Sequence, residues 1–301
     1  MAQPKRNEHS VGNWLSDRVI RGLIRLALAL PYGARVRFVG AATRNVIAPL
    51  AGYQARAMDN LARVYPDMPA PERRRIARAV ADNAGRTLIE NYSTAEFTAR
   101  MADVTPTGPG MAALEQAHAD GRPVVLVTGH FGNYEAGRAA LVARGYNIGG
   151  LYRPMRNPYF NDHYVRTMES FGGPVFPQGR RGTGGFVRHL KAGGMLVLLT
   201  DQHQARGART RFMGLPVKTA TSAADLALKY DALLIPFYGT RAADGLSFSV
   251  ELEAPVPHSD GQTMTQALND SLEARVRARP EQWFWIHRRW KVKTKPPRAR
   301  A

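Results

Sequence analysis

The residues PVVLVTGHFGNYE, at positions 123–135, are the stretch that decides the fold of this chain. Its first six residues are apolar and rich in β-branched side chains, which predicts a short buried strand over Pro123–Thr128. Gly129 then favours a turn, and Asn133 is a residue type that caps helices, so we expect a helix from Asn133 to Arg144. The stretch therefore predicts a strand, a tight turn and a helix.

The turn of this unit holds His130, and Glu135 follows five residues later. On one continuous helix, side chains five apart would point about 140° away from each other. If His130 lies in the turn and Asn133 caps the helix, Glu135 falls in the first helical turn and a contact becomes feasible. An ionised Glu135 would then orient the imidazole of His130, which would act as a general base. The alternative is a histidine satisfied within a tight turn and a solvated glutamate.

Strands and helices alternate through the rest of the chain, which predicts an α/β sheet with helices on its faces. Further strands are expected over Asn147–Tyr152, Met195–Thr200, Ala232–Tyr238 and Leu246–Leu252. Helices are expected over Asn13–Leu30, most of Arg44–Arg100, Asn161–Ser170, Thr183–Lys191, Ala220–Lys229 and Met264–Arg279.

Two polar residues directly follow predicted strands. Arg153 comes after Asn147–Tyr152, and Asp201 comes after Met195–Thr200. Because ligands bind at the carboxyl ends of strands in open α/β sheets, Asp201 is expected near His130 if the sheet is parallel. Arg153 is a candidate cation for stabilising an oxyanion. The alternative for Asp201 is a helix or turn cap.

The charge of the chain points to an acidic partner. Lys and Arg total 42 against 24 Asp and Glu, giving a formal charge of +18. Nucleic acid, an anionic membrane face or an acidic carrier protein would each be attracted to it. The absence of cysteine excludes disulfides, zinc–thiolate sites, iron–sulfur clusters and cysteine nucleophiles. No trusted metal-ligand spacing is present, so neither a metal nor a cofactor is expected.

The N-terminal region, residues 1–45, is interpreted as a membrane-associated segment. In the helix expected over Asn13–Leu30, Arg18, Arg21 and Arg25 share one face, and apolar residues fill much of the rest. The uncharged run Leu26–Leu30 is much shorter than the roughly 20 residues that cross a bilayer. An amphipathic helix lying among the headgroups is therefore favoured, with a tilted span or an ordinary domain helix as alternatives.

Residues 46–295 are expected to form the main domain, followed by a basic tail at 296–301. Near its end, aromatic side chains stand beside a run of cations. This combination suits a membrane interface, or a final buried segment followed by a polar tail. The aromatic residues are Trp283, Phe284, Trp285 and Trp290.

Several segments, in their order and spacing, resemble the lipid A biosynthesis lauroyl/myristoyl acyltransferase family. The resemblance covers roughly Arg122 to Lys291. Its segments are His130–Glu135, YRP at 152–154 with NP at 157–158, TDQ at 200–202, the 212–220 loop, and PEQWFWIHRRWK at 280–291. It implies a glycerophosphate-acyltransferase-like mixed sheet flanked by helices, on the cytoplasmic face of a bacterial inner membrane. It also implies transfer of a fatty acyl chain from an acyl carrier protein thioester to a hydroxyl of a lipid A precursor.

By this resemblance His130 is the catalytic base and Glu135 its partner. Other side chains are expected to bind substrate or surround the site: Asn133, Arg153, Arg166, Arg180, Arg181 and Asp201. Arg180 and Arg181 stand in a Gly-rich stretch at 178–185, interpreted as a loop that contacts phosphate or is simply solvated. The implied partners are the acidic carrier protein, the anionic precursor and the membrane, with no nucleic acid and a monomeric enzyme.

Two alternatives stay open at this point. The same histidine and carboxylate would serve an acyltransferase acting on another glycolipid or on a lysophospholipid. A non-catalytic basic protein that binds membrane or nucleic acid is the other alternative, supported by the charge alone.

Overall fold

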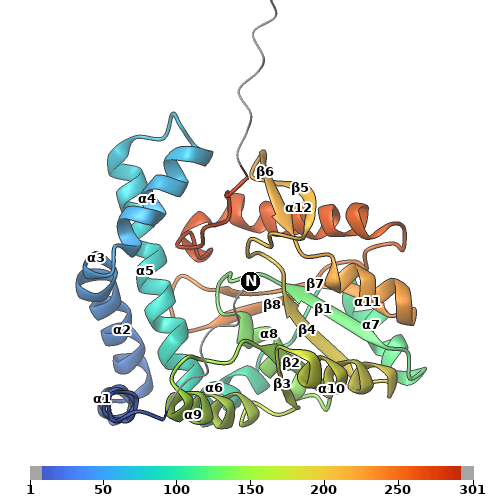
Figure 1. Cartoon of the computed structure of the whole chain (residues 1–301), viewed down its shortest axis with the longest axis horizontal. Coiled ribbons are helices and arrows are strands. Elements are labelled where there is room, and N and C mark those ends of the chain that lie inside the picture. Colours follow the sequence, from blue (N-terminus) through green and yellow to red (C-terminus); the bar gives the residue numbers. More distant parts are fainter. Residues whose placement is uncertain (1–8, 293–301) are drawn as a thin grey trace, which may run out of the picture.

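Residues 9–292 are described by this computed structural model, apart from the side chains of Arg180 and Arg181. Six strands form one sheet in the order β3-β2-β4-β1-β7-β8 (Figure 1). Neighbouring strands run parallel, except that β8 is antiparallel to β7. The strands are β1 (Val124–Thr128), β2 (Ile148–Tyr152), β3 (Val175–Pro177), β4 (Met195–Leu199), β7 (Leu233–Arg241) and β8 (Phe248–Leu252). The predicted α/β fold with a mixed sheet flanked by helices is confirmed.

Both faces of the central strand β1 are buried, which explains its continuous apolar run. Val124 and Leu126 pack into a core with α8, whereas Val125 and Val127 pack into a second core with α10 and α11. The helices that accompany the sheet are α7 (Gly110–Ala119), α8 (Tyr134–Val142), α9 (Pro158–Glu169), α10 (Arg180–Lys191), α11 (Ser222–Tyr230), α12 (Gly261–Ala278) and the short η2 (Pro280–Gln282).

The N-terminal third is helical, as predicted, and lies to one side of the sheet (Figure 1). It consists of α1 (Val11–Leu28), α2 (Tyr32–Ala42), η1 (Thr43–Ile47), α3 (Ala48–Leu50), α4 (Tyr53–Val64), α5 (Ala70–Tyr92) and α6 (Thr94–Ala102). The π-helical turn η1 runs across the boundary expected between residues 45 and 46.

Helix α1 buries an acidic side chain and leaves several apolar side chains exposed, along with Arg18 and Arg25. Asp17 is fully buried and lies 3.6 Å from Arg21, whereas Leu15, Val19 and Leu23 are exposed. The alternative of an ordinary domain helix predicts the opposite arrangement, with apolar residues facing the core. Within residues 9–292, no helix combines the length and the apolar character that crossing a membrane requires.

Strands β3, β5 (Ala208–Phe212) and β6 (Leu215–Thr219) were not predicted. β5 and β6 form a separate antiparallel hairpin, whose alternation of polar and apolar side chains is interrupted by Pro216. The hairpin turn places Met213 and Gly214 at positive φ, as a tight two-residue turn requires. Its signal in the sequence is weak because only Gly214 belongs to a residue type that favours this conformation.

The three tryptophans near the C-terminus are core residues, whereas Phe284 is only partly buried. Trp283 and Trp285 are fully buried, and Trp290 packs with them against α12 and the β5–β6 hairpin. The structure thus supports a final buried segment and places none of the three tryptophans at a membrane interface. The basic tail expected at 296–301 lies outside the described residues.

A buried ion pair ties α5 to the sheet. The Arg241 guanidinium, at the end of β7, meets the two carboxylate oxygens of Glu90 at 2.5 and 2.7 Å. Glu90 is fully buried and also accepts from Asn133 at 2.9 Å. Because a buried guanidinium without its anion is strongly unfavourable, this pair fixes how the N-terminal helices sit on the sheet.

Glu90→Gln is therefore expected to lower the free energy of unfolding by about 3 to 5 kcal/mol, because it leaves Arg241 buried without a counter-charge. Urea unfolding monitored by circular dichroism measures this loss. The control Glu115→Gln, at an exposed position on α7, should change the stability by less than about 0.5 kcal/mol. Equal effects of the two substitutions would contradict a structural role for the pair.

Candidate active site

The site begins where two neighbouring parallel strands end. Thr128 of β1 lies opposite Leu199 of β4, so the residues two positions beyond each strand also come together. His130 and Asp201 occupy those positions. Nδ1 of His130 lies 2.8 Å from Oδ1 of Asp201, and the His130 backbone N–H donates to Oδ2 at 2.8 Å. The predicted proximity of Asp201 to His130 is confirmed.

Asp201 is buried but remains ionised. Burial alone would raise its pKa, but the adjacent His130 and the hydrogen bonds it donates hold the pKa of Asp201 far below its ordinary value. The indole N–H of Trp283 also donates to Oδ2 at 3.0 Å. A fixed carboxylate at Nδ1 selects the imidazole tautomer whose other nitrogen, Nε2, carries a free lone pair. His130 is therefore oriented to accept a proton at Nε2.

A long apolar groove runs past the His130 side chain. It has a volume of about 1030 Å³ and lies between α1, α2, η1, α5 and the C-terminal segment. Its apolar lining includes Ile20, Leu23, Leu26, Phe38, Ile47, Leu88, Phe160 and Phe284. The groove has the lining that a fatty acyl chain requires, because burial of each methylene is favourable by about 0.8 kcal/mol.

A second, more polar cavity of about 320 Å³ also reaches His130. Glu135, Arg153 and Gln202 line it, together with residues at the carboxyl ends of β2 and β4. His130 thus stands between an apolar groove and a polar cavity.

Glu135 lines the same polar cavity as His130 but has a different partner from the expected one. Its carboxylate pairs with Arg138 at 3.2 Å, whereas Nδ1 of His130 is hydrogen-bonded to Asp201. Arg138 is buried at 2% exposure, and its other donors reach the Gly172 carbonyl at 2.5 Å and the Ile148 carbonyl at 3.4 Å. A buried guanidinium needs an anion, and Glu135 supplies it from one helical turn away.

Asn133 caps α8, as predicted. Its Oδ1 accepts from the backbone N–H of Glu135 at 3.0 Å, and its amide donates to Glu90. The side chain is fully buried and lines neither cavity at His130, so its role in the structure is to hold the turn.

Arg166 lies away from His130. It lines a small cavity with Arg21, Arg25 and His163, between α9 and α1. Tyr164, two residues earlier, faces the groove, and two residues along a helix turn the side chain by about 200°. The helix register therefore directs Arg166 away from the groove.

Arg180 and Arg181 begin α10, where the sequence indicated a loop. Two glycines of this stretch serve close packing: a Cβ at Gly182 would lie 1.8 Å from the Pro177 carbonyl oxygen, and one at Gly185 would lie 3.1 Å from the Phe176 ring. Gly182 and Gly185 thus reflect the contact between α10 and β3. The side chains of both arginines lie outside the described part of the chain.

The C-terminal segment 282–287 completes the site, a role that local pattern did not reveal. The backbone N–H of Phe284 donates to the His130 carbonyl at 3.0 Å, and that of Gly132 donates to the Gln282 carbonyl at 3.0 Å. Gly132 is at φ +55°, and a Cβ there would lie 1.9 Å from the Gly239 carbonyl oxygen. The turn therefore fits only when a glycine is present.

His287 faces His130, with 4.5 Å between the ring centroids. Burial lowers the pKa of His287 to about 4, against the opposing effect of Asp201, while His130 and Arg289 lower it further. His130, Asp201 and His287 could offer metal ligands, since their donor atoms lie within 4.8 Å of one another. A direct hydrogen bond already joins His130 to Asp201, and this arrangement suits proton transfer.

Stability should depend on pH through His287. Because its pKa is lower in the folded state, its contribution is fully present above about pH 6.5 and is lost as pH falls toward about 4. This contribution should fall by about 2 to 3 kcal/mol between pH 7 and pH 4.5. Urea unfolding at both pH values should show a smaller pH-dependent loss for His287→Gln than for the wild type. An unchanged loss in the variant would assign the pH dependence to other groups.

Comparisons with known proteins identify the family of this chain. A profile of the family described as "Bacterial lipid A biosynthesis acyltransferase" matches residues 6–292. A Haemophilus influenzae lipid A biosynthesis acyltransferase is 26% identical over 180 residues, which span 59% of this chain and 56% of that protein. The Escherichia coli K12 lipid A biosynthesis lauroyltransferase is 26% identical, and a second H. influenzae lipid A biosynthesis acyltransferase is 25% identical. These two matches cover 90% and 93% of this chain, and 90% of each relative. The chain belongs to the bacterial lipid A biosynthesis acyltransferase family.

Proposed function

We propose that this protein transfers a fatty acyl chain from an acyl carrier protein thioester to a hydroxyl of a lipid A precursor, with His130 as the general base. One observation carries the proposal: the hydrogen-bonded pair of His130 and Asp201 stands at the wall of a long apolar groove. The pair can activate a hydroxyl, and the groove can hold the chains that bring donor and acceptor together.

The reaction needs no covalent enzyme intermediate. Nε2 of His130 takes the proton from the acceptor hydroxyl, whose oxygen bonds to the thioester carbonyl carbon. Asp201 stabilises the resulting imidazolium, as the third member of a triad stabilises its histidine. When the carbon–sulfur bond breaks, the proton passes from His130 to the leaving thiolate. Arg153, which lines the polar cavity, is the proposed cation for the oxyanion.

Glu135 stays in the proposal as the second carboxylate of the site. It faces the polar cavity with His130, and its ion pair with Arg138 fixes its position. The orienting role belongs to Asp201 in this proposal, because Asp201 holds Nδ1. Asn133 supports the turn. Arg180 and Arg181 remain proposed contacts for the phosphates of the acceptor. Arg166, between α1 and α9, is proposed to contact the acceptor at its periphery.

We place the protein on the cytoplasmic face of the bacterial inner membrane, as a monomer. The exposed apolar side of α1 supports docking on a bilayer, and the formal charge of +18 favours both an anionic leaflet and an acidic carrier protein. The groove includes Leu23 and Leu26 of the same helix, so the surface that meets lipid is continuous with the groove.

His130→Ala and Asp201→Asn should each lower acyl transfer by about 10²- to 10⁴-fold, because the first removes the base and the second its orienting charge. The assay follows, by mass spectrometry, the transfer from acyl carrier thioesters to a tetra-acylated lipid A precursor. Glu135→Gln should cost less than Asp201→Asn. The reverse order would give the orienting role to Glu135, and full activity of His130→Ala would exclude His130 as the base.

Leu15→Glu should weaken binding to anionic phospholipid vesicles by about 10- to 100-fold, since burial of a leucine side chain contributes roughly 1.5 to 3 kcal/mol. Leu15 is exposed on α1 and does not line the groove. Leu228→Glu makes the same change at an exposed position on α11, and co-sedimentation with vesicles should be nearly unchanged by it. Equal losses in the two variants would reject α1 as the docking surface.

A further inference from the structure

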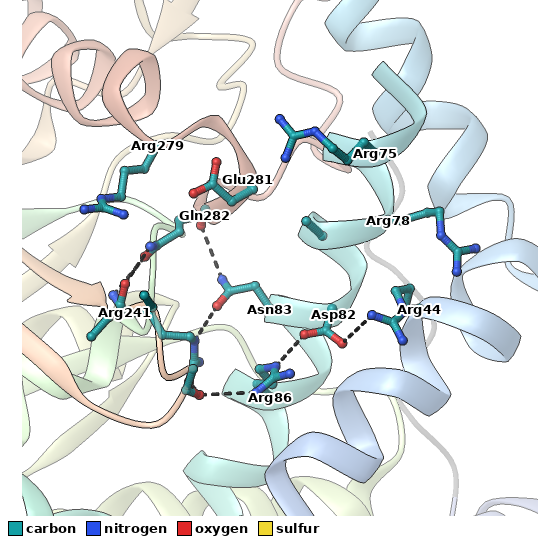
Figure 2. Close-up of a pocket in the computed structure, with 14 residues that line it drawn as sticks. Arg44, Arg75, Arg78, Asp82, Asn83, Arg86, Arg241, Arg279, Glu281 and Gln282 are labelled. Carbon is teal, nitrogen blue, oxygen red and sulfur yellow. Dashed lines mark hydrogen bonds and ion pairs between the residues drawn. The ribbon is translucent and has the colours of Figure 1, made fainter. Parts of the chain in front are cut away.

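A second polar cavity, separate from the one at His130, is rich in arginine (Figure 2). It has a volume of about 450 Å³ and lies between α5, the turn that joins β7 to β8, and the segment after α12. Its lining includes six arginines and two acids. The arginines are Arg44, Arg75, Arg78, Arg86, Arg241 and Arg279, and the acids are Asp82 and Glu281. We call this cavity the arginine pocket.

Two of the guanidinium groups are fixed in place by the fold. Arg241 and Arg86 both donate to the Gly245 carbonyl, at 3.1 and 3.3 Å, and Figure 2 shows Arg86 reaching toward Asp82. Gly245 is at φ +74°, and a Cβ there would lie 2.7 Å from Nη1 of Arg86. Arg241 is buried and held from behind by Glu90. Arg86 is therefore preorganised, which lowers the entropy cost of binding an anion. Arg241 donates its five N–H groups to Asn83, Thr87, Glu90 and Gly245, so it holds this wall of the pocket in place.

The remaining arginines carry more positive charge than their neighbours neutralise. Arg78 donates to the neutral side chain of Asn45 at 2.8 Å, and Arg75 lies 3.8 Å from Glu72 at an exposed position. Even when Glu72 and Glu90 are counted with the two lining acids, guanidinium groups outnumber carboxylates by two. An anion with two negative charges would balance this excess.

We propose that the arginine pocket binds a phosphate group, presented either by a lipid headgroup or by a soluble phosphate ester. The planar fork of arginine matches phosphate oxygens with two parallel hydrogen bonds, and a phosphate accepts from several arginines at once. The pocket is concave and small, which fits a single phosphate better than the broad surface of an acidic protein.

The position of the pocket is suited to a phosphate at the surface of a membrane. The short segment η1 contributes Arg44 to the arginine pocket and Ile47 to the apolar groove. Asn83 and Gln282 line both cavities, so a thin wall of side chains separates them. A charged headgroup and an apolar chain would thus find neighbouring sites. The binding proposal stands on the pocket itself and does not require that the protein transfer acyl groups.

The test uses the full chain and its double variant Arg75→Gln/Arg279→Gln. Both residues are exposed at the pocket, so the fold should tolerate their replacement. Loss of a charge-assisted hydrogen bond corresponds to about a tenfold weaker affinity. Two probes are titrated at constant ionic strength: inorganic phosphate, followed by thermal shift, and phosphatidylcholine vesicles with or without phosphatidic acid, followed by co-sedimentation.

The control Arg206→Gln/Arg209→Gln removes the same charge from exposed positions outside the arginine pocket. A roughly tenfold loss for both probes in the pocket variant, with little change in the control, supports a general phosphate site. A loss for phosphatidic acid alone supports a site for lipid headgroups. Equal binding by both variants would overturn the proposal, as would weaker binding of an acidic carrier protein with phosphate binding unchanged.

Discussion

The parallel, in-register pairing of β1 and β4 is the constraint on which the site depends. Hydrogen bonding between these strands fixes Thr128 opposite Leu199. His130 and Asp201 each follow only two residues after these positions, so the strands also fix where the two polar side chains begin. Neither His130 nor Asp201 can move without disturbing a strand that is buried on both faces. The dyad is therefore held by the centre of the sheet, which suits the precise placement that the proposed general-base role requires.

Two buried carboxylates hold the His130 turn from opposite sides. Asp201 binds the ring and backbone of His130, while Glu90 receives the amide of Asn133 at the start of α8. Glu90 also pairs with Arg241, so the N-terminal helices and the sheet share the same anion. Charged groups of this kind are costly to bury but specify one arrangement when all their hydrogen bonds are made. The turn gains its shape from this network as much as from its glycines.

Much of the fold and part of the site could be predicted because their signals are local. The buried strand before His130, the cap at Asn133 and the carboxylate after β4 all follow from short runs of sequence and from the geometry of parallel sheets. The partner of Glu135 could not be predicted in this way. Arg138 needs an anion because it is buried, and its burial depends on how α8 packs. Trp283 and His287 lie about 150 residues after His130 in the chain, and only the tertiary fold brings these residues to the site.

The direction in which Arg166 points was also beyond the sequence. Tyr164 and Arg166 are two positions apart on α9, so their side chains point in nearly opposite directions, and the sequence does not show which of them faces the site. The structure gives that place to Tyr164. Charge alone was similarly ambiguous, because arginine is a residue type that is mostly exposed, and only the convergence of the α5 arginines with Arg241 and Arg279 makes a pocket.

The exposed apolar side chains of α1 determine how a lipid would reach the dyad in the proposed function. This helix forms one wall of the groove and exposes several leucines, so under the proposed docking on a bilayer the groove would lie against the acyl region of the leaflet. A twelve-carbon tail that left the leaflet through water would lose roughly 10 kcal/mol of favourable transfer free energy. Lateral entry between helices avoids that barrier, so lipid exchange would be governed by diffusion in two dimensions within the leaflet.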